Sequence, residues 1–102
     1  MTEPYDRARA LAALRFRALG DETRLRLLET LTSGERCVAE LMELTGLGQS
    51  LVSHHLRTLR EAGLVVDRRE GRWVYYSIAE QALNSVRLSL YELEPLKSAG
   101  VE

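Results

Sequence analysis

The chain has 102 residues, of which 45% are hydrophobic, and its formal net charge at pH 7 is −1. This length suits one domain, and the apolar content is sufficient for a buried core. No apolar run is long enough to cross a bilayer and no signal-peptide pattern is seen, so we expect a cytoplasmic protein without a membrane partner. The single cysteine, Cys37, excludes an intrachain disulfide. The near-neutral charge excludes nucleic-acid binding through overall charge, but it is compatible with a local basic surface.

The N-terminal third of the sequence predicts two helices. Residues 4–18 form the first helix, which can begin at Pro4 because proline is tolerated in a first helical turn. Asp21 is a suitable N-cap for the second, which ends near residues 32–34. We expect the second helix to be a core scaffold, with Arg24 and Arg26 as solvated surface charges.

The middle of the sequence predicts a helix-turn-helix. The first helix covers residues 37–45, and Gly46 suits the left-handed backbone of a sharp turn. The second helix, residues 49–62, is amphipathic, with Val52 and Leu56 on its apolar face. His55 lies about 100° around the helix from its neighbour and toward this apolar face, so we expect it to be partly buried and structural. The opposite face and its edges carry hydrogen-bonding and cationic side chains, which are Gln49, Ser50, Ser53, His54, Arg57 and Arg60.

A β-hairpin is predicted for residues 64–78, turning at Glu70-Gly71. Three arginines surround the turn, namely Arg68, Arg69 and Arg72. A helix with polar groups suits base edges in the DNA major groove, and a basic hairpin beside it suits phosphates. This combination is the plan of a winged helix-turn-helix that reads double-stranded DNA.

The last predicted helix, residues 79–96, has apolar positions at the spacing of a helix-pairing seam. The first helix also carries an apolar stripe. Both stripes together predict a homodimer formed by the two ends of the chain. The interface residues that we expect are Leu11, Leu14, Leu83, Val86, Leu90 and Leu93.

Two stretches carry a resemblance to a known family. The run SLVSHHLRTLREAGLVVDRREGRWVYYSI, residues 50–78, and the run ALGDETRLRLL, residues 18–28, resemble the ArsR/SmtB family of small bacterial metal- and metalloid-responsive repressors. The resemblance covers roughly residues 16–78. It implies a mainly α fold with a small β-hairpin in the order ααααββα, dimerising through the first and last helices. It also implies repression at an inverted-repeat operator, relieved by an effector.

The effector is less well indicated. Arsenic-, lead- or cadmium-sensing members of the family carry a Cys-Val-Cys signature, in which Cys37 matches the first cysteine and Ala39 replaces the second. Soft ions usually require several thiolates. Cys37 is therefore a packing residue, a residual site for a thiophilic ion such as arsenite, or a redox-sensing thiol. The family's other site uses Asp, His and Glu of the last helix; residues 79–94 contain neither His nor Asp, so we expect no such zinc site.

Two other classes of protein agree less well with the sequence. A thiol–histidine enzyme would pair Cys37 with His54 or His55, but no third orienting group or oxyanion motif is evident, so we expect no catalysis. A winged helix that binds proteins instead of DNA is disfavoured by the polar helix face and the hairpin arginines. An organic ligand or a partner protein stays open as the effector.

Overall fold

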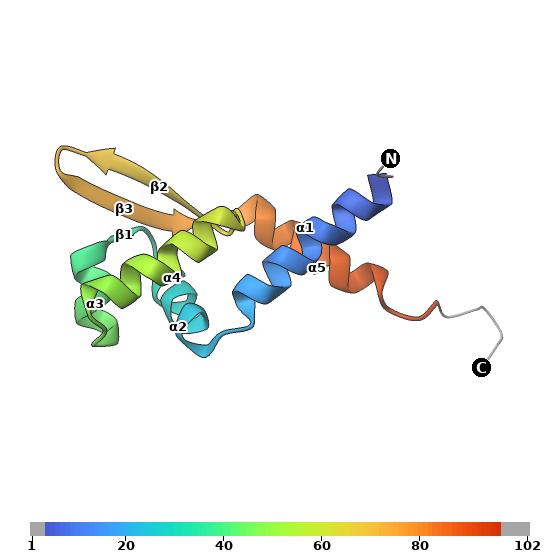
Figure 1. Ribbon diagram of the computed structural model, residues 1–102, viewed down its shortest axis with the longest axis horizontal. Helices are drawn as coiled ribbons and strands as arrows, with labels where there is room; N and C mark the ends of the chain where they lie inside the picture. The colour runs from blue at the N-terminus through green and yellow to red at the C-terminus, as the bar shows by residue number, and fades with distance from the viewer. Residues whose placement is uncertain (1–3, 97–102) are drawn as a thin grey trace.

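The computed structural model describes residues 4–96, which form a winged helix-turn-helix (Figure 1). The helices and strands in chain order are α1 (Pro4–Leu19), α2 (Glu22–Leu31), β1 (Arg36–Cys37), α3 (Val38–Thr45), α4 (Gln49–Glu61), β2 (Val65–Glu70), β3 (Trp73–Ile78) and α5 (Glu80–Glu92). The helix-turn-helix is α3–α4, and β2–β3 is the wing. The predicted mainly α fold with a small hairpin is thereby confirmed.

The sheet has one strand more than the sequence predicted. Its three strands are antiparallel in the order β1-β3-β2, and Arg36 of β1 pairs with Tyr76. In β3, Tyr76 and Ile78 pack against the core, whereas Trp73 at its start is exposed. The short strand β1 fastens the start of α3 to the wing.

A continuous apolar core lies beneath the helix-turn-helix. The side chains that are completely inaccessible to solvent are Leu27, Leu41, Val52, Leu56, Leu59 and Leu64. Three other leucines of α2, α3 and α4 are exposed to solvent, namely Leu25, Leu44 and Leu51. The side of each helix that faces the core is a narrow stripe, so only the apolar residues at its centre are buried.

Three arginines donate hydrogen bonds to backbone carbonyls at the C-terminal ends of helices. Arg15 Nε bonds the Ala62 carbonyl at 3.0 Å, Arg24 Nε the Ala18 carbonyl at 2.6 Å, and Arg26 Nη2 the Thr45 carbonyl at 2.8 Å. Such carbonyls lack helical partners, and a cation there also complements the helix dipole. The expectation of a solvated surface charge is therefore wrong for Arg24, which is half-buried, whereas Arg26 is exposed although it also bonds a helix end.

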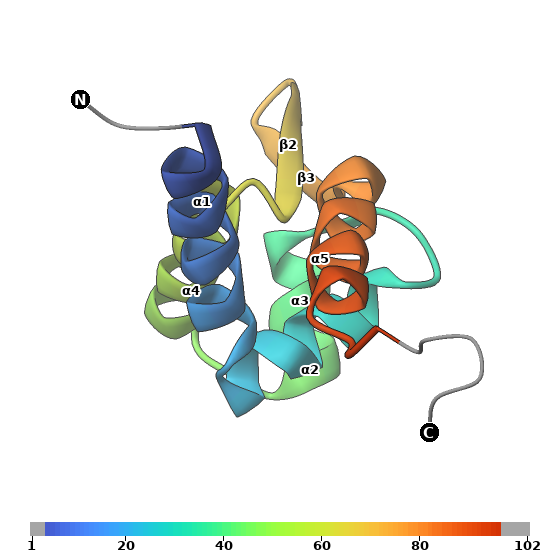
Figure 2. The ribbon, with the colours of Figure 1, turned by 90° about the vertical axis from the view of Figure 1, so that its right-hand side faces the viewer.

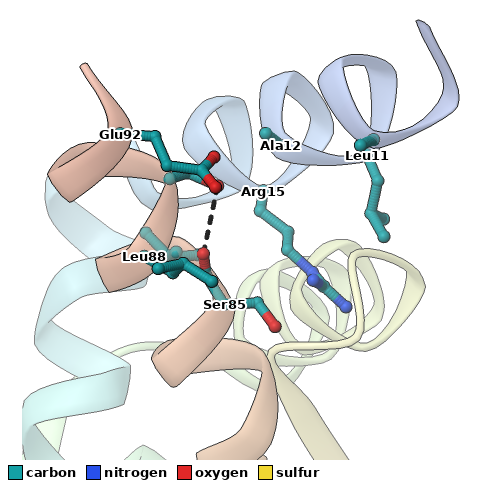
Figure 3. A pocket seen from close by; sticks show the side chains of 9 residues that line it. Leu11, Ala12, Arg15, Ser85, Leu88 and Glu92 are labelled. Atoms are coloured by element: carbon teal, nitrogen blue, oxygen red, sulfur yellow. Dashed lines mark hydrogen bonds between the residues drawn. The ribbon is translucent and has the colours of Figure 1, made fainter. Parts of the chain in front are cut away.

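Helices α1 and α5 lie next to each other at the end of the molecule opposite the wing tip (Figures 1 and 2). Helix α5 ends at Glu92, four residues before the predicted end at 96, with Leu93 as its C-cap. Between the two helices is a hollow of about 280 Å³, where Arg15 extends from α1 past Ser85 of α5 toward α4 (Figure 3). Within residues 4–96, no helix is long and apolar enough to span a membrane.

Candidate nucleic-acid interface

Helix α4 is held on the surface by its apolar side. The turn before it contains Gly46 with φ of 75°, a left-handed conformation that favours glycine. Val52, Leu56 and Leu59 anchor the inner face in the core. The predicted outer face is largely accessible: Ser53 is half-buried, and the exposed members are Gln49, Ser50, His54, Arg57 and Arg60.

His55 lies on the inner side of the same helix. Its exposure is 8%, and its Nδ1 atom is 3.1 Å from Arg24 Nη1. His55 therefore lies on the inner side as predicted, and it is buried more completely than the partial burial that we expected. Its ring meets that of His54 edge-on, with the centroids 5.2 Å apart, so the two neighbouring histidines face different environments.

The wing arginines differ in their contacts. Arg68 Nη2 lies 2.6 Å from Glu35 and its Nη1 lies 2.7 Å from Glu70, while its guanidinium sits 4.7 Å from the Tyr75 ring centre. The hydrogen bond from Arg68 holds the pKa of Glu35 below its usual value. Two carboxylates therefore occupy Arg68, which reduces its capacity to contact an external phosphate.

Arg60 at the edge of α4 is also paired, since its Nη1 atom is 3.1 Å from Asp67 of β2. Among residues 4–96, the ion pairs include none with Arg57, Arg69 or Arg72. All three of these cations are exposed. Sequence reasoning could not find Glu35 as a partner of Arg68, because the two residues are 33 positions apart in the chain. Asp67 and Glu70 are close in sequence to the arginines with which they pair.

The start of α4 and the wing border a common hollow of about 300 Å³. Gln49 lines it from α4, and Arg72 and Trp73 line it from the wing. Cys37 of β1 and Met42 of α3 complete the lining. The fold therefore brings the first polar residue of α4 and a wing cation, which are separated in sequence, to one side of the molecule.

Cys37 stands at the junction of β1 and α3. Its exposure is 9%, and its backbone N–H donates to Glu40 Oε1 at 3.0 Å. In the part of the chain that the structure describes, no group of three or more His, Cys, Asp or Glu side chains is arranged to hold a metal ion. The geometry of Cys37 resembles that of a packing residue at a helix start more than that of a metal ligand.

Comparison with known proteins assigns these features to a family. The family model described as bacterial regulatory protein, arsR family, matches residues 21–66, which run from the N-cap of α2 into the wing. The arsenical resistance operon repressor of Bacillus subtilis is 34% identical over 73 residues, covering 71% of this chain and 70% of that protein. The chain belongs to the ArsR family.

Other ArsR-family relatives agree in sequence and in fold. An arsenic resistance transcriptional regulator of Pseudomonas putida is 48% identical over 64 residues, which are 62% of this chain and 50% of that protein. The chain thus spans about half the length of this relative. The solution structure of a homodimeric winged helix-turn-helix DNA-binding domain from Mycobacterium bovis has a TM-score of 0.76 and 30% identity, covering 90% of this chain and 87% of that one.

Proposed function

We propose that this ArsR-family protein is a homodimeric transcriptional regulator that binds an inverted-repeat operator in double-stranded DNA and represses the adjacent promoter. One observation carries the proposal: the exposed polar face of α4 lies beside wing cations that are free of ion pairs within residues 4–96. The proposed activity is binding, not catalysis.

The chemistry of α4 suits the major groove. The groove admits an α-helix, and the N-terminal part of a recognition helix usually contacts the bases. Gln49 can pair with adenine, Ser50 and Ser53 are short enough to approach base edges, and His54 adds a ring nitrogen. Arg57 lies one turn further and can reach guanine or phosphate.

The wing supplies contacts that do not depend on sequence. Arg69 and Arg72 are exposed near the hairpin tip, where Gly71 has φ of 63° and allows the tight turn. Phosphate contacts from such residues fix the register of a protein on the duplex. We assign phosphate or minor-groove contacts chiefly to Arg69 and Arg72, and a smaller contribution to Arg68 and Arg60, which already have carboxylate partners.

The dimer would form through the α1–α5 end of the molecule. Apolar side chains there are partly or largely exposed, including Leu11 at 43%, Leu90 at 52% and Leu93 at 75%. Leu14 adds to this surface from α1. Val86 and Leu83, by contrast, pack on the core of their own chain, so the proposed interface relies on the four leucines at positions 11, 14, 90 and 93.

The test replaces Ser53 and His54 together with alanine. We expect the double variant to remain folded and dimeric, because neither side chain belongs to the core. Its preference for an operator duplex over random DNA should disappear, since each lost base contact removes about 1–3 kcal/mol of discrimination. Fluorescence anisotropy with both duplexes measures this difference. Gln81→Ala, an exposed substitution on α5, is the control that should preserve the preference, and preserved preference in the double variant would refute the assignment.

An effector is proposed to release the DNA. The B. subtilis and P. putida relatives are named for arsenic resistance, which makes arsenite or another thiophilic ion acting through Cys37 one candidate. The other candidates are a redox signal, an organic ligand or a partner protein. The burial of Cys37 counts against sensing by this thiol, whether of an ion or of a redox signal. Any effector must bind the DNA-free shape more tightly than the DNA-bound shape.

A further inference from the structure

A cluster of three polar side chains lies behind the recognition helix, on the side away from the proposed DNA contacts. His55 Nδ1 is 3.1 Å from Arg24 Nη1 and 4.0 Å from Asp21 Oδ2. Asp21 Oδ2 in turn accepts a hydrogen bond of 3.0 Å from the backbone N–H of Arg24, which caps α2. The cluster therefore joins the inner face of α4 to the first turn of α2.

Arg24 extends this connection to α1. Its Nε donates to the Ala18 carbonyl at 2.6 Å and its Nη2 donates to the Arg17 carbonyl at 3.2 Å, both near the end of α1. One planar guanidinium thus contacts two carbonyls of α1 and the ring of His55. A lysine, with one point charge at its end, cannot reproduce three separated contacts in one plane.

The contact between Arg24 and His55 requires a particular protonation state. A guanidinium only donates hydrogen bonds, so Nδ1 of His55 must accept and therefore carries no proton. Burial lowers the pKa of His55 below its ordinary value of 6.5, the charge of Asp21 opposes this effect, and the charges of Arg24 and His54 act in the same direction as burial. Asp21 and Arg24 face the ring from α2, His54 is its neighbour in α4, and α1 presents backbone carbonyls to Arg24.

We propose that His55 and Arg24 position the recognition helix relative to α1, and that a proton on His55 Nδ1 releases this contact. His55 and Arg24 are positioning residues, because they act through the placement of α4 and do not touch DNA. The proposal rests on the proposed function for its biological meaning, since α1 belongs to the proposed dimer and α4 to the proposed DNA interface. The orientation of each recognition helix within the dimer would then depend on this cluster.

Protonation would exchange one partner for another. A proton on Nδ1 replaces the hydrogen bond from Arg24 with two cations in contact, and it attracts the Asp21 carboxylate, which now lies 4.0 Å away. Movement of Asp21 toward the ring would weaken its cap on the Arg24 N–H. The contact between Arg24 and His55 requires a neutral His55. Its contribution to the placement of α4 is therefore complete above pH 6.5 and is lost as the pH falls through the lowered pKa of His55.

The experiment compares the parent protein with His55→Asn as full chains on the same operator duplex, recovered by selection from random DNA. An asparagine amide oxygen can accept from Arg24 at the position of Nδ1, and it does not titrate. Taking the ratio of the two Kd values at each pH removes the pH effects that are common to both proteins. We expect the parent Kd to rise relative to the variant Kd as the pH is lowered from 7.5 through the lowered pKa of His55, by at most about tenfold per pH unit.

A constant ratio over this range would overturn the proposal. Arg24→Lys supplies a second variant: it keeps the charge, and we expect weaker operator binding with the pH dependence of His55 removed. Circular dichroism at each pH confirms that both variants remain folded.

An NMR titration of the parent protein without DNA separates failure of this inference from failure of the proposed function. If the amide signals of α4 and of Ala18 move together with the titration of His55, then His55 and Arg24 do connect α4 to α1, even if no operator is bound. If His55 titrates without moving the Ala18 signal, His55 does not control the contact between α4 and α1, whether or not the protein binds DNA.

Discussion

At the scale of single residues, the role of Cys37 determines whether the effector is a thiophilic ion bound by this thiol or another signal. Its side chain is buried and belongs to no group of three or more metal-binding side chains in residues 4–96, so we expect it to serve packing. Cys37→Ala should lower the free energy of unfolding by about 1 kcal/mol, as loss of one buried atom does. Arsenite, antimonite, cadmium, zinc or nickel, titrated against the DNA complex in an anisotropy assay, should affect parent and variant equally. Release from the parent alone would identify Cys37 as the sensor.

Sequence reasoning at this scale succeeded where a helical position determines the environment. The 100° step from His54 to His55 was enough to place one ring outside and the other inside. It failed for Arg24, because the acceptors of a long side chain depend on which helix ends come close. His55 lies 31 residues from Arg24 in the chain, and no local pattern connects them.

At the scale of elements, the wing should bind DNA mainly through charge. Replacing Arg69 and Arg72 with alanine should weaken binding to operator and random duplexes alike. The slope of log K against log salt should fall in magnitude by about 2, because each phosphate contact contributes about 0.9. Arg68→Ala is the matched control: its guanidinium is already paired with Glu35 and Glu70, so we expect a smaller change in slope. Equal slopes for the double variant and the parent would show that the wing does not reach phosphate.

Elements with a strong periodic pattern were predicted well, whereas the short strand β1 and the end of α5 were not. The amphipathic spacing of α4 and the alternation in β3 placed both within a residue or two of their observed bounds. The strand β1 has only two residues, too few for any alternation, and it forms because β3 offers an edge. Helix α5 ends at Glu92, before the predicted end. The prediction missed this end because the apolar spacing continues to Leu93, and such a pattern does not by itself mark where a helix stops.

At the scale of the whole molecule, the α1–α5 end and the recognition helix are mechanically linked. Arg15 of α1 donates to the last carbonyl beyond α4, at Ala62, and Arg24 holds the end of α1 against His55. A change in how two copies pack through α1 and α5 would therefore alter the orientation of both recognition helices. Two states of this kind are what an effector needs in order to control DNA binding.

The proposed dimer is tested by placing a charge on its apolar surface. Leu11→Glu with Leu90→Glu should yield a folded monomer, because both leucines are about half exposed, at 43% and 52%, and contribute little to the core. Sedimentation velocity measures the oligomeric state. Operator affinity should fall about 100-fold or more, because two linked half-sites bind far more tightly than one. Leu25→Glu on α2, where the leucine is 44% exposed, carries the same change outside the interface and should stay dimeric. A dimer that survives the double substitution would place the interface elsewhere on the molecule.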